Sequence, residues 1–222
     1  MILALETSSS LCAVCVLDPL DGKALLEVAN DIGRGHAERL MGDVTEALAQ
    51  AGIGYADLTA VACGVGPGSF TGIRVGVAAA RGFALALKIK VCGVTSLQAI
   101  ALLARPHAGG KPVLVVQDAG REEFHVQRFD ADARPLALPQ ALTFPALLSQ
   151  LPDAPAFVCG SGAHLLAGRS ACEISPLNTA ATARAVGLAA LDPAMIVPPA
   201  PLYLRAPDAK PQAGFAVART DR

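Results

Sequence analysis

Glycine is concentrated between Gly64 and Gly76, directly after the short apolar run Val61–Cys63 and before an apolar stretch that continues to Leu87. Glycine permits positive φ angles and close approach of one backbone to another, and Pro67 stiffens the bend. The order predicts a buried strand, a tight turn and then a helix. A chain that repeats such units folds as a sheet covered by helices, which is an α/β class of fold.

Two interpretations of this turn stay open. Ser69 and Thr71 are suited to cap the following helix, so the turn can be purely structural. Alternatively, the free N–H groups at the helix N-terminus can face a phosphate. The residues of this phosphate-facing or structural turn, with one carboxylate from each half of the chain, are Glu6, Gly66, Gly68, Ser69, Thr71, Gly72 and Asp118.

Three well-known motifs do not match the turn. A Walker A loop requires a lysine, and none lies between Gly64 and Gly76. The dinucleotide-binding motif requires glycine where Ser69 or Thr71 stands. A nucleophile elbow requires glycine two residues before its serine, and Pro67 holds that place before Ser69.

The first hundred residues predict the order βββαβαβα. Three apolar runs separated by short turns, at residues 2–6, 11–17 and 24–30, predict an antiparallel meander. After them we expect a helix at 36–51, a strand at 61–63, a helix at 72–87, a strand at 90–94 and a helix at 96–103. Because the connections change from hairpins to helical crossovers, the sheet should be mixed.

A linker is predicted at residues 105–112, where proline and glycine gather. It divides a first lobe, residues 1–104, from a smaller second lobe, residues 113–192. In the second lobe we expect strands at 113–117, 124–129 and 156–159 and helices at 143–150 and 179–191. Residues 193–222 form a proline-rich C-terminal segment.

Composition limits the classes of function. Hydrophobic residues are 53% and charged residues 17%, which excludes a disordered chain and suggests a surface shared with another chain. The formal net charge of −1 offers no basic excess for autonomous nucleic-acid binding. No uninterrupted apolar run reaches the roughly 18 residues of a membrane helix, and Met1–Glu6 lacks the basic flank of a signal peptide. We therefore expect a cytoplasmic protein.

Few residues are candidates for chemistry. Cys12 and Cys15 have the spacing of a zinc or redox pair, but residues three apart on a strand face opposite sides of the sheet. The four histidines are not paired at helical spacing, so no metal site is predicted. Glu6 and Asp118 each end the first strand of a lobe. If they face each other they suit a metal–phosphate site, whereas the simpler interpretation is that each caps a turn.

Several segments together resemble one family. They are Leu3–Ser8, His36–Met41, the turn Gly64–Gly76, Gly93–Leu97 and Pro201–Arg205. On these motifs the chain is similar to the TsaB family, also called YeaZ, of bacterial threonylcarbamoyladenosine synthesis on tRNA. The resemblance spans most of the chain, is strongest in residues 60–97 and is loose in the second lobe.

The resemblance implies an actin-like, sugar-kinase and Hsp70-type (ASKHA) fold with two lobes. It implies a non-catalytic scaffold that activates a catalytic TsaD-like subunit and works with a TsaE-like ATPase. Their assembly would transfer a threonylcarbamoyl group to the adenosine next to the anticodon in tRNAs that read codons beginning with A. ATP and metal would belong to the partner subunits, this chain would need no cofactor of its own, and tRNA would bind only through the complex.

The resemblance also places the pairing surface on the first two long helices. The residues expected there are mostly apolar or small: His36, Leu40, Met41, Val44, Leu48, Ile73, Val75, Gly76, Ala79 and Phe83. Without its partner, this chain could satisfy the same surface by forming a homodimer.

The chain departs from the family in three places. Glu6 stands where aspartate is usual, and Gly120 and His125 replace an arginine and a tyrosine. Two other functions stay open. A phosphotransferase or ATPase of the same fold would use the glycine turn with Glu6 and Asp118. A peptidase ranks last, because the sequence offers neither a nucleophile–base pair nor a zinc motif.

Overall fold

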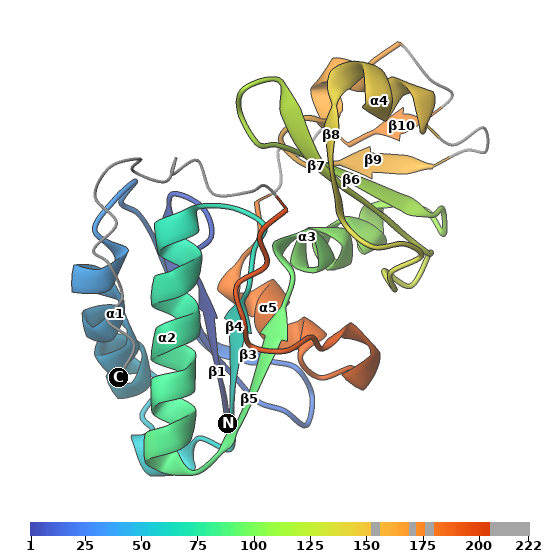
Figure 1. Ribbon diagram of the computed structural model, residues 1–222. Coiled ribbons are helices and arrows are strands. Elements are labelled where there is room, and N and C mark those ends of the chain that lie inside the picture. Colours follow the sequence, from blue (N-terminus) through green and yellow to red (C-terminus); the bar gives the residue numbers. More distant parts are fainter. Residues whose placement is uncertain (152–155, 169–171, 176–179, 205–222) are drawn as a thin grey trace, which may run out of the picture.

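The computed structural model describes all residues except 152–155, 169–171, 176–179 and 205–222. Two five-stranded mixed sheets form two lobes (Figure 1). The first sheet contains β1 (Ile2–Glu6), β2 (Leu11–Leu17), β3 (Ala24–Asp31), β4 (Ala60–Gly64) and β5 (Lys90–Val94). The second contains β6 (Val113–Asp118), β7 (Glu123–Phe129), β8 (Gln140–Thr143), β9 (Phe157–Cys159) and β10 (Glu173–Ile174).

Both sheets have the same topology. The first has the order β3-β2-β1-β4-β5, and the second, read from its other edge, has the order β8-β7-β6-β9-β10. In each, three strands form an antiparallel meander, the fourth pairs in parallel with the first, and the fifth pairs in parallel with the fourth. The chain therefore repeats one unit, which confirms the predicted two-lobed α/β fold of mixed sheets flanked by helices.

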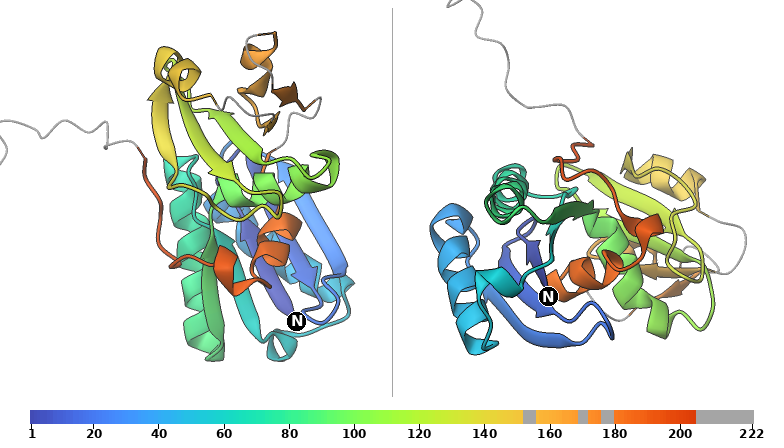
Figure 2. Two further views of the ribbon diagram at one scale, coloured as in Figure 1. Left: turned by 90° about the vertical axis from the view of Figure 1, so that its right-hand side faces the viewer. Right: turned by 90° about the horizontal axis from the view of Figure 1, so that it is seen from below.

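The elements stack in layers (Figures 1 and 2). The helices α1 (His36–Gln50) and α2 (Phe70–Leu87) lie side by side over one face of the first sheet. The helices α3 (Ser96–Ala104) and α5 (Ala183–Ala189) lie between the two sheets, in a core to which both lobes contribute. The short helix α4 (Phe144–Ser149) covers the outer face of the second sheet.

The predicted helix at 179–191 is shorter and belongs elsewhere. Its described part, α5, packs against β1 and β2 of the first lobe, where Gly187 lies against Ala4 and Leu17. The assignment of residues 113–192 to the second lobe is therefore wrong for α5. Glycine at position 187 permits this close packing, because an added Cβ would lie 3.1 Å from the Cβ of Ala4.

Two other predicted boundaries are corrected. The segment after α5 returns to the first lobe, where Val197 bridges to Gly93 and Leu202 N–H donates to the carbonyl of Val65. The predicted linker begins with a 3-10 turn, Arg105–His107, that connects α3 to β6. Because one apolar core runs through α3 on both sides of it, this linker does not separate two independent cores.

The apolar residues of α1 divide between the core and the surface. Leu40, Val44 and Leu48 are buried, whereas Met41 is 48% exposed. Asp43 takes a core position instead, since its Oδ1 accepts hydrogen bonds from Arg39 Nε (2.6 Å) and Asn30 Nδ2 (3.1 Å). These two donors offset part of the cost of burying the carboxylate, whose Oδ2 has no hydrogen-bond partner among the described residues.

Candidate functional site

The glycine turn packs directly on the backbone that follows β1. A Cβ added at Gly68 or Gly72 would lie less than 3.0 Å from the carbonyl oxygens of Ser8 and Thr7. Two hydrogen bonds tie the same surfaces: Ser69 N–H donates to Ser8 O (2.6 Å) and Thr7 Oγ1 donates to Gly72 O (2.8 Å). These glycines make room for the backbone of Thr7 and Ser8, which follows β1.

The start of α2 is also closed by its own residues. Ser69 Oγ accepts from Gly72 N–H (3.2 Å) as the N-cap, and Thr71 is exposed. Gly66 has a φ of +91° and its carbonyl accepts from Ser96 N–H (2.8 Å). The N–H groups of Ser69 and Gly72 are therefore already paired within the chain, which supports the interpretation as a structural turn.

Glu6 does not face the cleft. Its side chain is fully buried, Oε1 accepts from Ser8 N–H (2.5 Å), and Gly64 leaves the space that the carboxyl group fills. Oε2 has no hydrogen-bond partner among the described residues. Asp118, in contrast, is exposed at the cleft, where its Oδ1 accepts from Gly120 N–H (2.7 Å). The two carboxylates do not face each other, and each accepts from a backbone N–H two residues on, in agreement with the simpler interpretation that each caps a turn.

Burial raises the pKa of Glu6 above its ordinary 4.5, and the Ser8 hydrogen bonds oppose that shift only in part. The folded state thus holds the proton more tightly than the unfolded chain, so folding stability falls as pH rises above about 4.5. We expect Glu6→Gln, which keeps an acceptor for Ser8, to melt at a higher temperature than the wild type at pH 8. The difference should shrink towards pH 4.5; thermal melts at both values check it, and an equal gap at both would contradict it.

A cleft of about 520 Å³ separates the lobes. Its lining is rich in hydroxyl groups and comprises Ser8, Ser9, Ser10, Pro67, Gly68, Ser69, Ser96, Gln117, Asp118, Ala119, His125, Ser161, Ala180 and Ala181. None of these lining residues is a lysine or an arginine. A nucleoside triphosphate bound here would meet a carboxylate without a compensating cation on the described walls, which disfavours phosphate binding.

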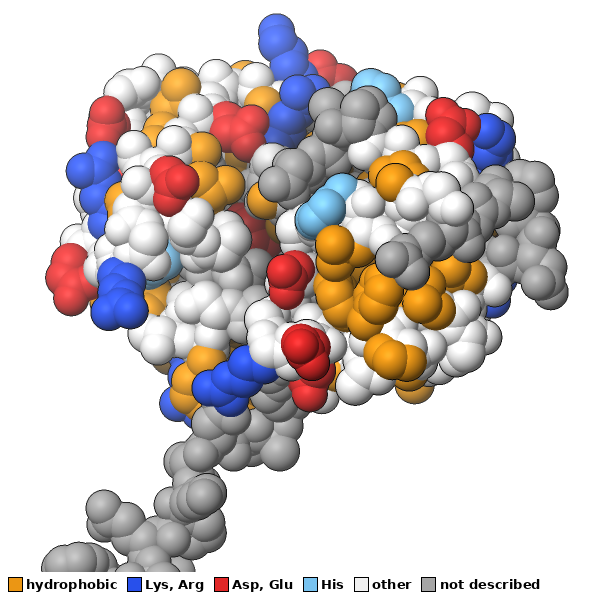
Figure 3. All heavy atoms as spheres, turned by 90° about the horizontal axis from the view of Figure 1, so that it is seen from above, with side chains coloured by type: hydrophobic (Ala, Val, Ile, Leu, Met, Phe, Trp, Pro, Cys, Tyr) orange, Lys and Arg blue, Asp and Glu red, His pale blue; other side chains and the backbone are white. Residues whose placement is uncertain are grey.

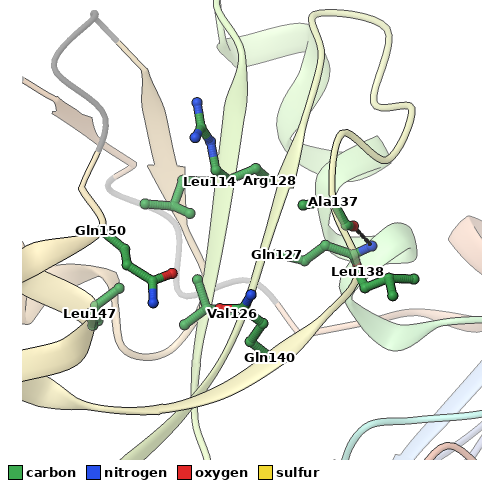
Figure 4. Close-up of a pocket in the computed structure, with 9 residues that line it drawn as sticks. All are labelled: Leu114, Val126, Gln127, Arg128, Ala137, Leu138, Gln140, Leu147 and Gln150. Carbon is green, nitrogen blue, oxygen red and sulfur yellow. Dashed lines mark hydrogen bonds between the residues drawn. The ribbon is translucent and has the colours of Figure 1, made fainter.

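Two further hollows carry no ionisable cluster. One, of about 370 Å³, lies between the segments 135–139 and 194–202 and is lined mainly by Ala, Val, Leu, Met and Pro. The other, of about 50 Å³, lies in the second lobe (Figure 4). There Gln127 Nε2 donates to Ala137 O (2.9 Å). The second hollow is too small for a substrate, and neither arranges an acid–base pair.

The cysteine pair on β2 is split by the sheet. Cys12 contributes to the core under α1 and α2, whereas Cys15 contributes to the core on the opposite face. Burial raises the pKa of each thiol to about 12, which keeps both protonated and unreactive at neutral pH. Within the described parts of the chain, no group of three or more His, Cys, Asp or Glu side chains is placed to hold a metal ion.

Six of the residues predicted for the pairing surface are buried in the first lobe itself. They are His36, Leu40, Val44, Leu48, Ile73 and Gly76. Buried in this way, the five side chains and the backbone at Gly76 leave no surface for a partner, which corrects their assignment. Met41 is exposed, and Val75, Ala79 and Phe83 are partly exposed, so these four keep surface for contact.

The outer face of α2 adds apolar surface that the sequence argument missed. Leu85 is 82% exposed and Phe70 is 45% exposed, while Tyr55 stacks on Phe83 with ring centres 5.9 Å apart. Only 33% of the residues in this helix are buried. By length and composition alone, the helix is long and apolar enough to cross a membrane. The sequence carried this signal, because the helix is mostly apolar, with Arg74 and Arg81 as its charged residues, but has only one sheet to cover.

The family model described as TsaD, tRNA N6-adenosine threonylcarbamoyltransferase, matches residues 28–156. An uncharacterised Mycobacterium tuberculosis protein is 37% identical over 219 residues, which are 96% of this chain and 95% of its own. The Escherichia coli tRNA threonylcarbamoyladenosine biosynthesis protein TsaB is 33% identical over 131 residues, 59% of this chain and 55% of its own.

The solved structure of YeaZ from Pseudomonas aeruginosa shares the fold. It superposes with a TM-score of 0.78 at 28% identity, over 91% of this chain and 99% of its own. The match extends through both lobes, including the second, where the sequence motifs are loose. With the sequence relatives, it shows that this chain belongs to the TsaB (YeaZ) family.

Proposed function

We propose that this protein is the non-catalytic scaffold subunit for threonylcarbamoylation of adenosine in tRNA. In this role it pairs with a TsaD-like catalytic subunit through the outer face of α1 and α2. The observation that carries the proposal is α2 itself, an 18-residue apolar helix of which the chain buries only a third. A surface of this kind is unfavourable in water and typical of a face covered by another chain.

Three observations support a scaffold over an enzyme. The start of α2 is occupied by the carbonyls of Thr7 and Ser8, Glu6 is buried away from the cleft, and the described walls of the cleft carry no cation. A phosphotransferase or ATPase of this fold would need charge at that point to bind and polarise a phosphoryl group. The chemistry, with its ATP and metal, is therefore assigned to the TsaD-like and TsaE-like partners.

The proposal also covers how tRNA binds, whether the isolated chain dimerises, and in which compartment it works. Among the described side chains on the face in Figure 3, Lys and Arg lie scattered between acidic groups, so tRNA is expected to bind through the complex rather than to this chain alone. The same apolar face would let the isolated chain form a homodimer. The buried thiols with raised pKa values accord with a reducing cytoplasm.

A reconstitution tests the proposal. Purified TsaD-like and TsaE-like subunits, tRNA, ATP and threonylcarbamoyl-adenylate are combined with and without this chain, and modified adenosine is measured by mass spectrometry. We expect modification to fall at least about 100-fold without the chain, because the partner would lack the surface that orders it. Full activity without it would refute the scaffold role. Turnover of ATP by the chain alone would support a phosphotransferase instead.

A further inference from the structure

Three side chains beside the first turns of α2 form a stacked group, called here the Arg74 cluster: Phe70, Arg74 and Tyr203. The guanidinium carbon of Arg74 lies 3.8 Å from the centre of the Phe70 ring. The rings of Phe70 and Tyr203 have centres 5.0 Å apart. Arg74 Nε donates a hydrogen bond to Tyr203 Oη (2.8 Å), across 129 positions of the chain.

The cluster leaves donors free on the surface. Tyr203 Oη accepts from Arg74, so its own O–H proton can be donated outward. Among the ion pairs of the described residues, none involves Arg74. Arg74 is exposed, and Phe70 and Tyr203 are 45% and 40% exposed. The guanidinium Nη groups and a phenol O–H are therefore available together, which suits a planar acceptor with two oxygens.

The cluster is also held in place. Leu202 N–H donates to Val65 O (2.8 Å), and Gly66 has no Cβ where the carbonyl of Leu202 approaches. These contacts fix the backbone beside Tyr203 against the glycine turn, while the Phe70 ring supports the guanidinium. A preorganised arginine and tyrosine lose little entropy on binding, and such residues dominate interface energetics.

We propose that the Arg74 cluster is the polar end of the α2 partner face and receives an Asp or Glu side chain of the TsaD-like subunit. The inference rests on the proposed function and adds the chemistry of the contact. A carboxylate complements the unpaired guanidinium charge, and the neighbouring apolar surface of α2 favours a protein over RNA. RNA binding would require several cations to neutralise successive phosphates.

The test measures the Kd between the full-length chain and its cognate TsaD-like subunit by calorimetry. We expect Arg74→Glu to weaken binding about 100-fold, Arg74→Lys about 10-fold and Tyr203→Phe about 5-fold. Lysine keeps the positive charge but loses the bidentate donor geometry of the guanidinium, and phenylalanine loses only the hydroxyl donor. Arg128→Glu, at an exposed arginine of the second lobe, is the matched control and should leave the Kd unchanged.

A structural role alone would not predict rescue. Each partner Asp and Glu is changed to Arg in turn, and one of these changes should restore binding to the Arg74→Glu variant at least tenfold. Folded variants with a Kd within threefold of wild type would overturn the inference while leaving the proposed function standing. Loss of tRNA affinity with intact partner binding would assign the cluster to phosphate and overturn it as well. A wild-type chain that binds no partner would overturn the proposed function and the inference together.

Discussion

Replacing Gly72 with alanine is expected to destabilise the first lobe by about 3 kcal/mol or more. The added methyl group would collide with the carbonyl of Thr7, which is backbone and cannot rotate away. Relief requires α2 to move off the β1–β2 turn, and that movement stretches the hydrogen bond from Thr7 Oγ1 to Gly72 O. The cost therefore combines overpacking with a weakened buried hydrogen bond.

Gly82 provides the matched control on the same helix. An added Cβ there meets nothing within 4 Å, and the position is exposed. Gly82→Ala should stabilise the protein by about 0.5–1 kcal/mol, because alanine has the higher helix propensity. Urea unfolding measures both variants. Equal effects of the two substitutions would show that the close approach of Thr7 does not require glycine at position 72.

This contrast shows why the glycine turn was the informative part of the sequence and why its purpose stayed open. The glycines at 66, 68 and 72 announce close approach of a neighbour, but not which neighbour. In the structure two of them face the backbone of residues 7 and 8, which lie more than 55 positions earlier in the chain. A glycine that makes room for a neighbouring backbone and a glycine that makes room for a phosphate look the same in a sequence.

Local patterns predicted the strands well, because each is bounded by its own turn chemistry. The meander, β4 and β5 lie where the apolar runs and turns place them. The short strands β8 and β10 were not predicted, since each is only a few residues long and is formed by pairing at a sheet edge. The position of α5 could not be predicted either, because its contacts with β1 and β2 join opposite ends of the chain.

The assignment of residues to the pairing surface was wrong in part for a related reason. On α1 and α2 the residues that cover the sheet and those that cover a partner are both apolar, so composition does not separate them. Leu40 and Ile73 were assigned to the partner and belong to the core, whereas Leu85 was omitted and is exposed. Only the rotation of each helix on its sheet decides which residues are buried, and on α1 that rotation buries Asp43 and exposes Met41.

The exposed leucine of α2 gives the sharpest test of the partner face. Leu85→Glu should leave the chain folded, because the side chain is 82% exposed. If the TsaD-like subunit covers this face, the new carboxylate is buried without a partner, and binding should weaken about 100-fold, or about 3 kcal/mol. Leu40→Glu is expected to unfold the first lobe instead, since Leu40 lies in its core.

Leu20 is the matched control, because it is 93% exposed but lies in the turn between β2 and β3, away from α2. Leu20→Glu adds the same charge and should leave the Kd for the catalytic subunit unchanged. The experiment therefore separates a general effect of negative charge from a local one. If Leu85→Glu binds as tightly as Leu20→Glu, the C-terminal half of α2 is free in the complex. The interface would then lie on α1 and on the half of α2 that contains Phe70, Arg74 and Val75.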